Sequence, residues 1–254
     1  DRTYTKYEDR WKERTPDWKP NVYEKEKDPI RAIYARRADH IMQIGEKAPA
    51  AQPDLRPGQI VIKDLDGYVR DENGNPKVDQ NGRFMLLGHA DGTIDEADTQ
   101  LIGTQDPGWM ASMTNTFKYK GFDLNIMFNG MFDRIMQDPT EMDFGLNGGN
   151  IAQNGSNMLR IIKDRWTFDN PSTTRPSSYY TSGTKYTAGD FFYQKAWFIR
   201  LQNISLGYTL PKSILTKSKI LNNVRFHASV NNVFVITPYN GLDPETDAYA
   251  AAYP

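Results

Sequence analysis

The stretch Gly121–Phe132, GFDLNIMFNGMF, alternates between large apolar and mostly polar side chains. The apolar face carries Phe122, Leu124, Ile126, Phe128 and Phe132, with Gly130 interrupting the row. The opposite face carries Asp123, Asn125 and Asn129 together with Met127 and Met131. A period of two is typical of a β-strand, so this segment is predicted to be a strand with one apolar side. That side must contact either a protein core or lipid.

Three further runs have the same pattern. MASMTNTFKY precedes YKG and GFDLNIMFNGMF, which predicts an antiparallel hairpin with a tight turn. In QKAWFIRLQNISLGYTL, apolar side chains at Ile204, Leu206, Tyr208 and Leu210 alternate with polar ones, and Pro211 ends the strand. In NNVRFHASVNNVFVIT, one face carries Val224, Phe226, Ala228, Val230, Phe234 and Ile236. Four two-faced strands are therefore expected.

The links between these strands are unequal in length. YKG is short, Pro211–Asn222 is longer, and the region 133–195 is predicted to be mostly loop. A membrane barrel uses strands of about 9–11 residues, apolar outside and polar inside, with short turns at one end and long loops at the other. A soluble β-sandwich has similar half-buried strands. Within an all-β fold, the pattern alone favours the soluble sandwich, and the loop asymmetry and low aliphatic content bring a transmembrane antiparallel β-barrel to equal standing.

Composition narrows the class of protein. A net charge of -1 argues against nucleic acid as an electrostatic partner, and the absence of cysteine excludes disulfides. Hydrophobic content is 38%, mean hydropathy is -0.69 and aromatic content is 12%, which suits sheets with one wet face. Because no run approaches about 20 apolar residues, any membrane span must consist of strands.

The first half of the chain is less regular. PIRAIYARRADHIMQIGE predicts either a short helix or a strand pair in an otherwise exposed region. Residues 50–110 are rich in Gly, Pro, Asp and Asn, and DENGNP and DQNGRF each contain Asn-Gly. They predict a small two-stranded excursion from Tyr68–Val69 to Phe84–Leu87.

The acidic segment around this excursion has ligand-like spacing. An EF-hand loop places oxygen donors at positions 1, 3, 5, 7, 9 and 12, with Gly at position 6. DGTIDEAD supplies the second half, and DLDG supplies positions 1 and 3 if residues 68–90 are an inserted hairpin. The predicted Ca²⁺ ligands are Asp64, Asp66, Asp91, the Thr93 carbonyl and Asp98, with Asp95 direct or through water. The alternative is a loop whose carboxylates cap turns without a metal.

Aromatic residues in the loops are candidates for stacking on a substrate: Trp109, Tyr179, Tyr180 and Tyr193, with Trp166 and Trp197 nearby in the same regions. The alternative is an aromatic girdle or loop packing. His40, His89 and His227 are far apart in sequence and lack a neighbouring nucleophile motif. The chain is therefore not expected to be an enzyme, and a glycan hydrolase is the weakest option.

Two blocks identify a family resemblance. FIRLQNISLGYTLP (Phe198–Pro211) and SVNNVFVITPYNGLDPE (Ser229–Glu245) resemble the C-terminal barrel signature of SusC/RagA, the TonB-linked outer-membrane transporters of Bacteroidetes. Upstream, PGQIVIKDLDG, DGTIDEADTQLIGTQDPGW and NTFKYKGFDLNIMFNG resemble the family in the same order. The match runs from about residue 57 to 247. In this family the acidic loop is usually continuous in sequence, so the insertion of residues 68–90 within it is a departure from the family pattern.

The resemblance implies late strands and extracellular loops of a barrel of about 22 strands, located in the cell outer membrane. It implies a nutrient importer for glycans or peptides that works with a SusD-like lipoprotein lid and with TonB, through an N-terminal region that would lie upstream. The chain is accordingly expected to be an interior-to-late part of a longer polypeptide. Its expected segments are 1–56, a loosely matched loop and strand region; 57–110, the acidic loop with its hairpin; and 111–254, barrel strands and loops. The alternative is a soluble carbohydrate-binding β-sandwich.

Overall fold

The computed structural model describes residues 28–29, 31–80, 83–138, 141, 157–178, 189–216 and 221–246. The chain divides into two compact units, residues 1–105 with 137–193, and residues 106–136 with 194–254. The segments expected from the sequence divide the chain differently, because residues 137–193 belong to the first unit and interrupt the barrel region.

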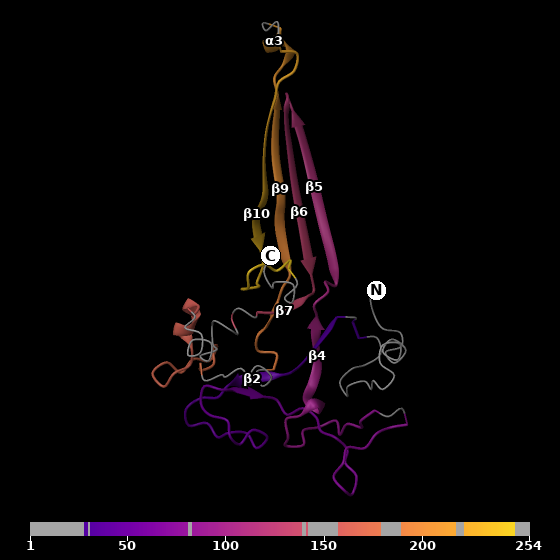
Figure 1. Ribbon diagram of the computed structural model, residues 1–254, viewed down its shortest axis with the longest axis vertical. Helices are drawn as coiled ribbons and strands as arrows, with labels where there is room; N and C mark the ends of the chain where they lie inside the picture. Colours follow the sequence, from indigo (N-terminus) through magenta and orange to yellow (C-terminus); the bar gives the residue numbers. More distant parts are fainter. Residues whose placement is uncertain are drawn as a thin grey trace. The chain divides into compact units, whose positions relative to one another are not determined.

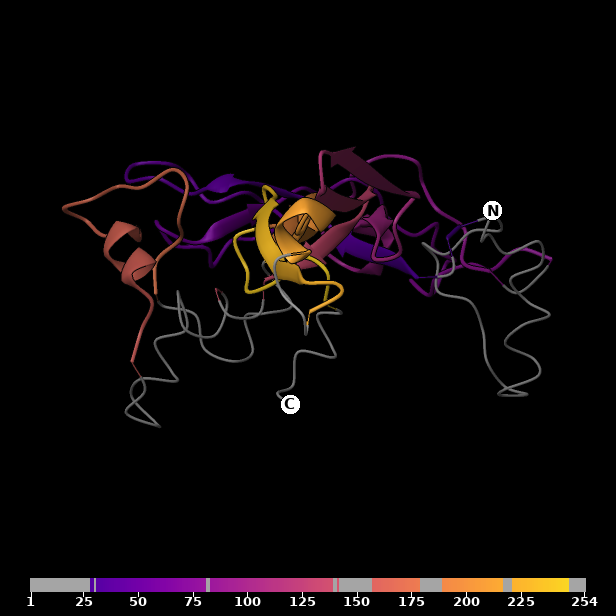
Figure 2. The same cartoon turned by 90° about the horizontal axis from the view of Figure 1, so that it is seen from above.

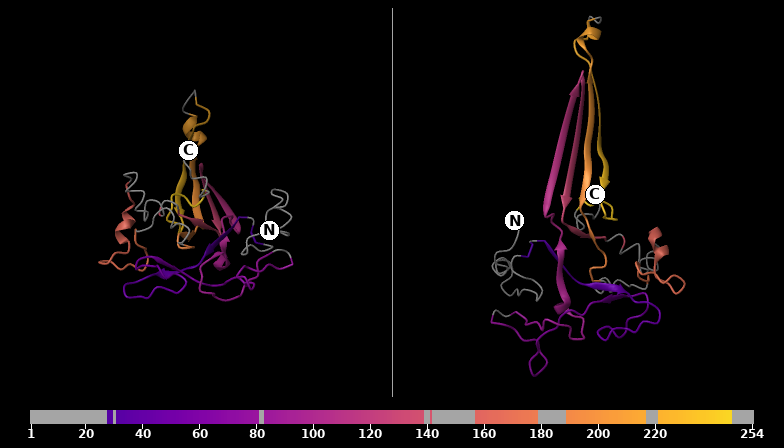
Figure 3. Two further views of the ribbon diagram at one scale, coloured as in Figure 1. Left: turned by 60° about the horizontal axis from the view of Figure 1, so that its bottom comes forward. Right: turned by 180° about the vertical axis from the view of Figure 1, so that it is seen from behind.

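The second unit contains one long antiparallel sheet with the strand order β10-β9-β6-β5 (Figures 1 and 3). The strands are β5 (Trp109–Tyr119), β6 (Phe122–Phe132), β9 (Phe198–Thr209) and β10 (Arg225–Ile236). All four predicted strands are present, and their 11 or 12 residues lie at or just above the roughly 9–11 residues of a membrane-barrel strand.

The turns of this sheet follow from local residue chemistry. Lys120 and Gly121 both have positive φ, 46° and 90°, which is the requirement of the tight hairpin turn that joins Tyr119 to Phe122. β9 ends at Thr209. Leu210 and Pro211 follow, and Pro211 precedes the short helix α3 (Lys212–Leu215). Seen from above in Figure 2, α3 lies over the end of the sheet.

Two β-bulges set the register of β9 against its neighbours. The pairing between β6 and β9 shifts between Met127 and Phe128, and the pairing between β9 and β10 shifts between Asn231 and Phe234. Asn232, inside the second shift, has a φ of 51°. An extra residue moves later side chains to the other face of a strand, so the face assignment of β9 changes at Gln202.

The first unit consists of short paired strands. β1 (Ala32–Arg36) pairs with β4 (Thr99–Thr104), and β2 (Ala38–Ile41) pairs with β3 (Ile60–Ile62). Of the two alternatives predicted for the N-terminal region, a short helix or a strand pair, the structure has strands. However, β1 and β2 pair with later strands rather than with each other. A small core of Ile60, Ile62 and Phe192 lies here, with Ala38, Ile94 and Phe191 packed against it.

The remaining elements are short. β7 (Ile135–Gln137) and β8 (Tyr193–Lys195) form a two-stranded sheet, and the chain passes from one unit to the other within these strands. The described residues also include the 3-10 helices η1 (Glu96–Asp98) and η3 (Arg160–Asp164). Among the described residues, no helix has both the length and the apolar composition needed to cross a membrane.

Candidate functional site

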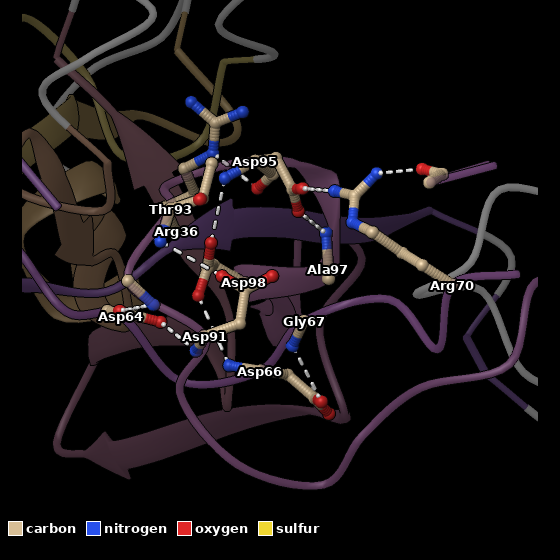
Figure 4. A network of polar contacts seen from close by, with 12 residues as sticks. Arg36, Asp64, Asp66, Gly67, Arg70, Asp91, Thr93, Asp95, Ala97 and Asp98 are labelled. Carbon is tan, nitrogen blue, oxygen red and sulfur yellow. Dashed lines mark hydrogen bonds and ion pairs between the residues drawn. The ribbon is translucent and has the colours of Figure 1, made fainter. Parts of the chain in front are cut away.

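The acidic segments predicted to meet do meet. Asp64 accepts hydrogen bonds from the backbone N–H of Asp91 at 3.2 Å and of Gly92 at 2.7 Å, although 27 and 28 residues separate them (Figure 4). Asp66 accepts from the N–H of Gly88 at 2.7 Å. The chain therefore leaves the acidic loop and returns to it, as the inserted excursion requires.

Asp98 is the centre of this loop. Its side chain is fully buried and accepts three backbone hydrogen bonds, from Leu65 at 2.6 Å, Asp66 at 3.2 Å and Asp95 at 2.8 Å. Asp95 in turn accepts from Ala97 N–H at 2.8 Å, which completes a capping box at the start of η1. Asp98 thus ties the two halves of the loop together through backbone amides.

The excursion has more parts than the sequence predicted. Tyr68 pairs with Leu86 as expected, but the intervening residues form two further hairpins instead of one plain two-stranded excursion. Lys77 N–H donates to Val69 O, Val69 N–H to Met85 O, and Met85 N–H to Lys77 O, at 2.8–2.9 Å. Three segments eight residues apart therefore close a ring of backbone hydrogen bonds, a pairing that the two Asn-Gly turns alone did not specify.

The carboxylates predicted to bind a metal ion accept hydrogen bonds from backbone N–H groups. Asp64, Asp66, Asp91, Asp95 and Asp98 each accept at least one main-chain N–H, and Thr93 N–H donates to Asp91 at 2.9 Å. Within the described residues, no group of three or more His, Cys, Asp or Glu side chains is arranged to hold a metal ion. This geometry is that of turn-capping carboxylates, and Ca²⁺ binding stays a prediction.

The long sheet has one apolar and one polar face, which its register defines across all four strands. Directly opposed residues in antiparallel strands point to the same side. The apolar face carries Trp109, Met113, Phe117 and Tyr119 of β5, the β6 row from Phe122 to Phe132, Ile199, Leu201, Ile204, Leu206 and Tyr208 of β9, and Phe226, Ala228, Val230, Phe234 and Ile236 of β10. The rows predicted for β6 and β10 are confirmed.

This apolar face is exposed on the outer strands β5 and β10 and mostly half-buried on β6 and β9, where Leu201 is buried. Phe117 is 56% exposed, Phe226 62% and Phe234 47%, which is unusual for aromatic side chains aligned on one sheet. Aromatic rings also gather at both ends of the face. Phe122 stacks on Tyr208 with ring centroids 4.2 Å apart at one end, and Trp109 stacks on Phe132 at 3.8 Å at the other.

The opposite face is polar and largely self-bonded. Asn125 Nδ2 donates to Thr116 Oγ1 at 3.0 Å, and Asn203 Nδ2 donates to Asn231 Oδ1 at 2.7 Å. The face also carries Ser112, Thr114, Ser205, Ser229, Asn129 and His227. It is thus composed mainly of amides and hydroxyls, with Asp123, Arg200 and Arg225 among its charged side chains.

Two of the four predicted substrate residues lie within the described part of the chain, one in each unit. Trp109 lies on the apolar face in register with Phe132, which fits the aromatic-girdle alternative. Tyr193 begins β8 and is half-buried. Tyr179 and Tyr180 lie outside the described residues. Sequence reasoning missed Arg200, whose guanidinium pairs with Asp243 and Glu245; the alternation of β9 breaks at Gln202, and that break was the available signal.

Comparisons with known proteins agree with this architecture. No protein-family model matches the chain. It is 30% identical to TonB-dependent receptor P39 of Formosa agariphila over 207 residues, covering 79% of this chain and 17% of that receptor. It is 29% identical to TonB-dependent receptor SusC of Bacteroides thetaiotaomicron over 192 residues, covering 73% of this chain and 17% of SusC.

Solved structures give the same result for the fold. The structure of the RagAB peptide transporter superposes with a TM-score of 0.56 and 21% identity, covering 86% of this chain and 21% of that chain. The matched proteins are named as receptors and transporters rather than as enzymes. The chain spans about a sixth of the length of the curated relatives it matches.

Proposed function

We propose that this chain, which belongs to the SusC/RagA family of TonB-dependent receptors over its matched residues, contributes strands and loops to an outer-membrane nutrient importer. In this proposal β5, β6, β9 and β10 are neighbouring strands of a transmembrane barrel. Their apolar face contacts lipid and their polar face lines the wet interior.

The single observation that carries the proposal is the two-faced sheet. Four strands of 11 or 12 residues present an apolar face on one side, exposed on β5 and β10 and mostly half-buried on β6 and β9, and mainly amides and hydroxyls on the other. Strands of about 9–11 residues span a bilayer when tilted, and their faces alternate between lipid and lumen. The aromatic pairs Phe122–Tyr208 and Trp109–Phe132 then occupy the two interfaces as a girdle.

The wider assembly is part of the same proposal. The likeness to SusC and to RagAB supports a SusD-like surface lipoprotein and TonB as partners, the latter through a region upstream of this chain. RagAB is named as a peptide transporter, and a glycan or a peptide is the substrate class that we propose here. Tyr193, with Tyr179 and Tyr180, stays a proposed contact for that substrate.

A pair of neighbouring positions on β6 tests which face is wet. The chain contains no cysteine, so Asn125→Cys and Ile126→Cys each give a single reactive thiol within it. In outer membranes that contain the full-length protein, a water-soluble maleimide is expected to label Asn125→Cys severalfold faster than Ile126→Cys. A lipid-attached quencher should reduce the fluorescence of a label at Ile126 only.

The same pair of variants also distinguishes the soluble sandwich. If that fold were right, the apolar position would be shielded by protein, and the protein would stay monomeric in buffer without detergent. Equal labelling of both positions, or quenching at Asn125 instead of Ile126, would contradict the proposed orientation.

A further inference from the structure

The chain beyond β10 folds back against its own sheet. We call its described part, Thr237–Thr246, the strap; it is the yellow segment at the foot of β10 in Figure 1. Thr237 Oγ1 donates to the carbonyl of Trp197 at 2.8 Å, and the N–H of Asn240 donates to Gln194 Oε1 at 3.0 Å. Tyr239 of the strap is buried against Met136 and Ala196, so the strap is anchored there, whereas from Gly241 onward it is held by side-chain contacts.

Two arginines hold the strap nearer its end. Arg134 Nη1 donates to the carbonyl of Pro244 at 2.9 Å. Arg200 Nη2 donates to Asp243 Oδ1 at 2.6 Å, and Arg200 Nε lies 3.1 Å from Glu245 Oε2. Arg200 projects from the polar face of β9, because its register partner on β6 is Asn129. The strap therefore covers the polar face at the end of the sheet where the long loops attach.

The ion pair at Arg200 is unequal in burial. The Arg200 side chain is 10% exposed and its guanidinium lies 5.6 Å from the Phe198 ring centroid, whereas Asp243 and Glu245 are 38% and 39% exposed. The cation is thus fixed within the sheet, and the two anions approach it from the solvent side.

Two buried polar atoms beside this ion pair, on Arg200 and Asn129, make no hydrogen bond of good geometry within the described part of the chain. Among the described residues, the buried Nε of Arg200 makes no aligned hydrogen bond, although Glu245 is at ion-pair distance, and the buried Oδ1 of Asn129 has no partner either. Buried polar atoms in folded proteins are normally satisfied, so an acceptor without a partner beside a donor that is paired only by charge needs an explanation.

Opening of the strap has one main electrostatic consequence. Side-chain contacts can break while β9 and β10 stay paired, but departure of Asp243 and Glu245 leaves a mostly buried guanidinium without a counter-ion. Removing one partner of such a pair is strongly unfavourable. An incoming carboxylate removes that penalty, because it matches the planar guanidinium in charge and geometry. A ligand of this kind shifts the strap toward its open state.

We propose that the end of the strap, from Gly241 to Thr246, is a displaceable cover over a carboxylate-binding site centred on Arg200, while Tyr239 stays in place. A carboxylate group of the ligand takes the place of Asp243 and Glu245 at the guanidinium, and Asn129 Oδ1 accepts a hydrogen bond from the same ligand. This site goes beyond the proposed importer function, which does not depend on it.

Distance measurements between spin labels test the proposal in the full-length protein in nanodiscs. Labels at Leu242→Cys, in the exposed part of the strap, and Lys118→Cys, at the far end of β5, report the position of the strap. The probes are N-acetylglycine and its neutral counterpart N-acetylglycinamide. We expect N-acetylglycine to increase a second distance population severalfold, N-acetylglycinamide to leave the distribution unchanged, and Arg200→Gln to abolish the response.

The double variant Asp243→Asn with Glu245→Gln provides a second test by the same distance measurement, and it leaves the buried Arg200 unchanged. It should populate the second distance without any probe, because both strap anions are neutralised. An unchanged distance distribution in this variant shows a fixed strap and overturns the proposal. Equal responses to the acid and the amide, or a response that survives Arg200→Gln, overturn it as well.

Discussion

Asp123 of β6 and Arg225 of β10 form an ion pair at 2.6 Å although β9 lies between their strands. Gly207 of β9 is the register partner of Asp123, and a β-carbon at this glycine would lie 2.6 Å from Asp123 Oδ1 and 2.7 Å from Arg225 Nη2. The pair therefore crosses the middle strand over a residue that has no side chain, on the polar face of the sheet.

Two strand glycines of this sheet should respond differently to alanine. At Gly207 the added methyl meets the ends of flexible side chains, so Gly207→Ala should cost about 1 kcal/mol or less, the scale of an exposed ion pair. At Gly130 it meets the Phe198 carbonyl oxygen at 2.7 Å, where the backbone must move, so Gly130→Ala should cost about 1–3 kcal/mol. Urea unfolding of the protein in micelles measures both, and a larger loss for Gly207→Ala would refute the register described here.

Replacement of Asp98 should open the acidic loop. Asp98→Ala leaves the N–H groups of Leu65, Asp66 and Asp95 without their acceptor, and an unsatisfied buried donor costs about 1–3 kcal/mol. We expect faster hydrogen exchange of these amides and a lower midpoint of unfolding. Asp79→Ala, which removes an exposed turn acceptor, is the matched control and should change little. Equal effects of the two variants would show that Asp98 does not hold the loop together.

Calcium binding by the acidic loop is open to a direct measurement. If Asp64, Asp66, Asp91, Thr93, Asp95 and Asp98 hold Ca²⁺, millimolar CaCl₂ should raise the melting temperature of the protein by mass action. Asp91→Ala should abolish the shift, whereas Asp71→Ala, in the inserted hairpins, should retain it. Absence of a shift in the unaltered protein, or the same shift in Asp91→Ala, would leave the carboxylates with their turn-capping role alone.

The turn after β2 should loosen as pH rises. Hydrogen bonds with Asp39 at 2.9 Å and with Glu46 at 2.6 Å raise the pKa of His40 above its ordinary value of 6.5. Lys63 also contacts Asp39, at 3.2 Å. A raised pKa stabilises the folded state below pH 6.5, and this stabilisation is lost as pH rises through the raised value. Exchange of the Gln43 amide, which donates to Glu46 at 2.9 Å, should therefore accelerate above pH 6.5 beyond its intrinsic dependence.

The pKa values of the two carboxylates in this turn are lowered, whereas that of His40 is raised. The hydrogen bond from His40 lowers the pKa of Asp39 below 3.8, and the Gln43 N–H, followed by His40, lowers the pKa of Glu46 below 4.5. Their contribution is present above those ordinary values and is lost as pH falls through the lowered ones. Protection should thus be greatest between about pH 4.5 and 6.5. His40→Gln should remove the change above pH 6.5, and an unchanged profile in that variant would contradict the assignment.

The two faces of the long sheet were predictable because alternation is a local property of the chain. The β6 row from Phe122 to Phe132 and the β10 row from Phe226 to Ile236 both appear on one side of the sheet, as their period of two required. The meeting of Asp64 with Asp91 was also predictable, since the two Asn-Gly pairs in the sequence between them predict that the chain reverses and returns.

The sequence by itself therefore determined the four long strands, the apolar side of β6 and β10, and the convergence of the acidic residues. Only the tertiary structure decided the bulge at Gln202, the ring of three hydrogen-bonded segments between residues 69 and 85, and the fastening of the strap at Arg200. The physical reason is that a face is fixed by neighbours two residues apart, whereas register and ion pairing depend on which distant strand lies alongside.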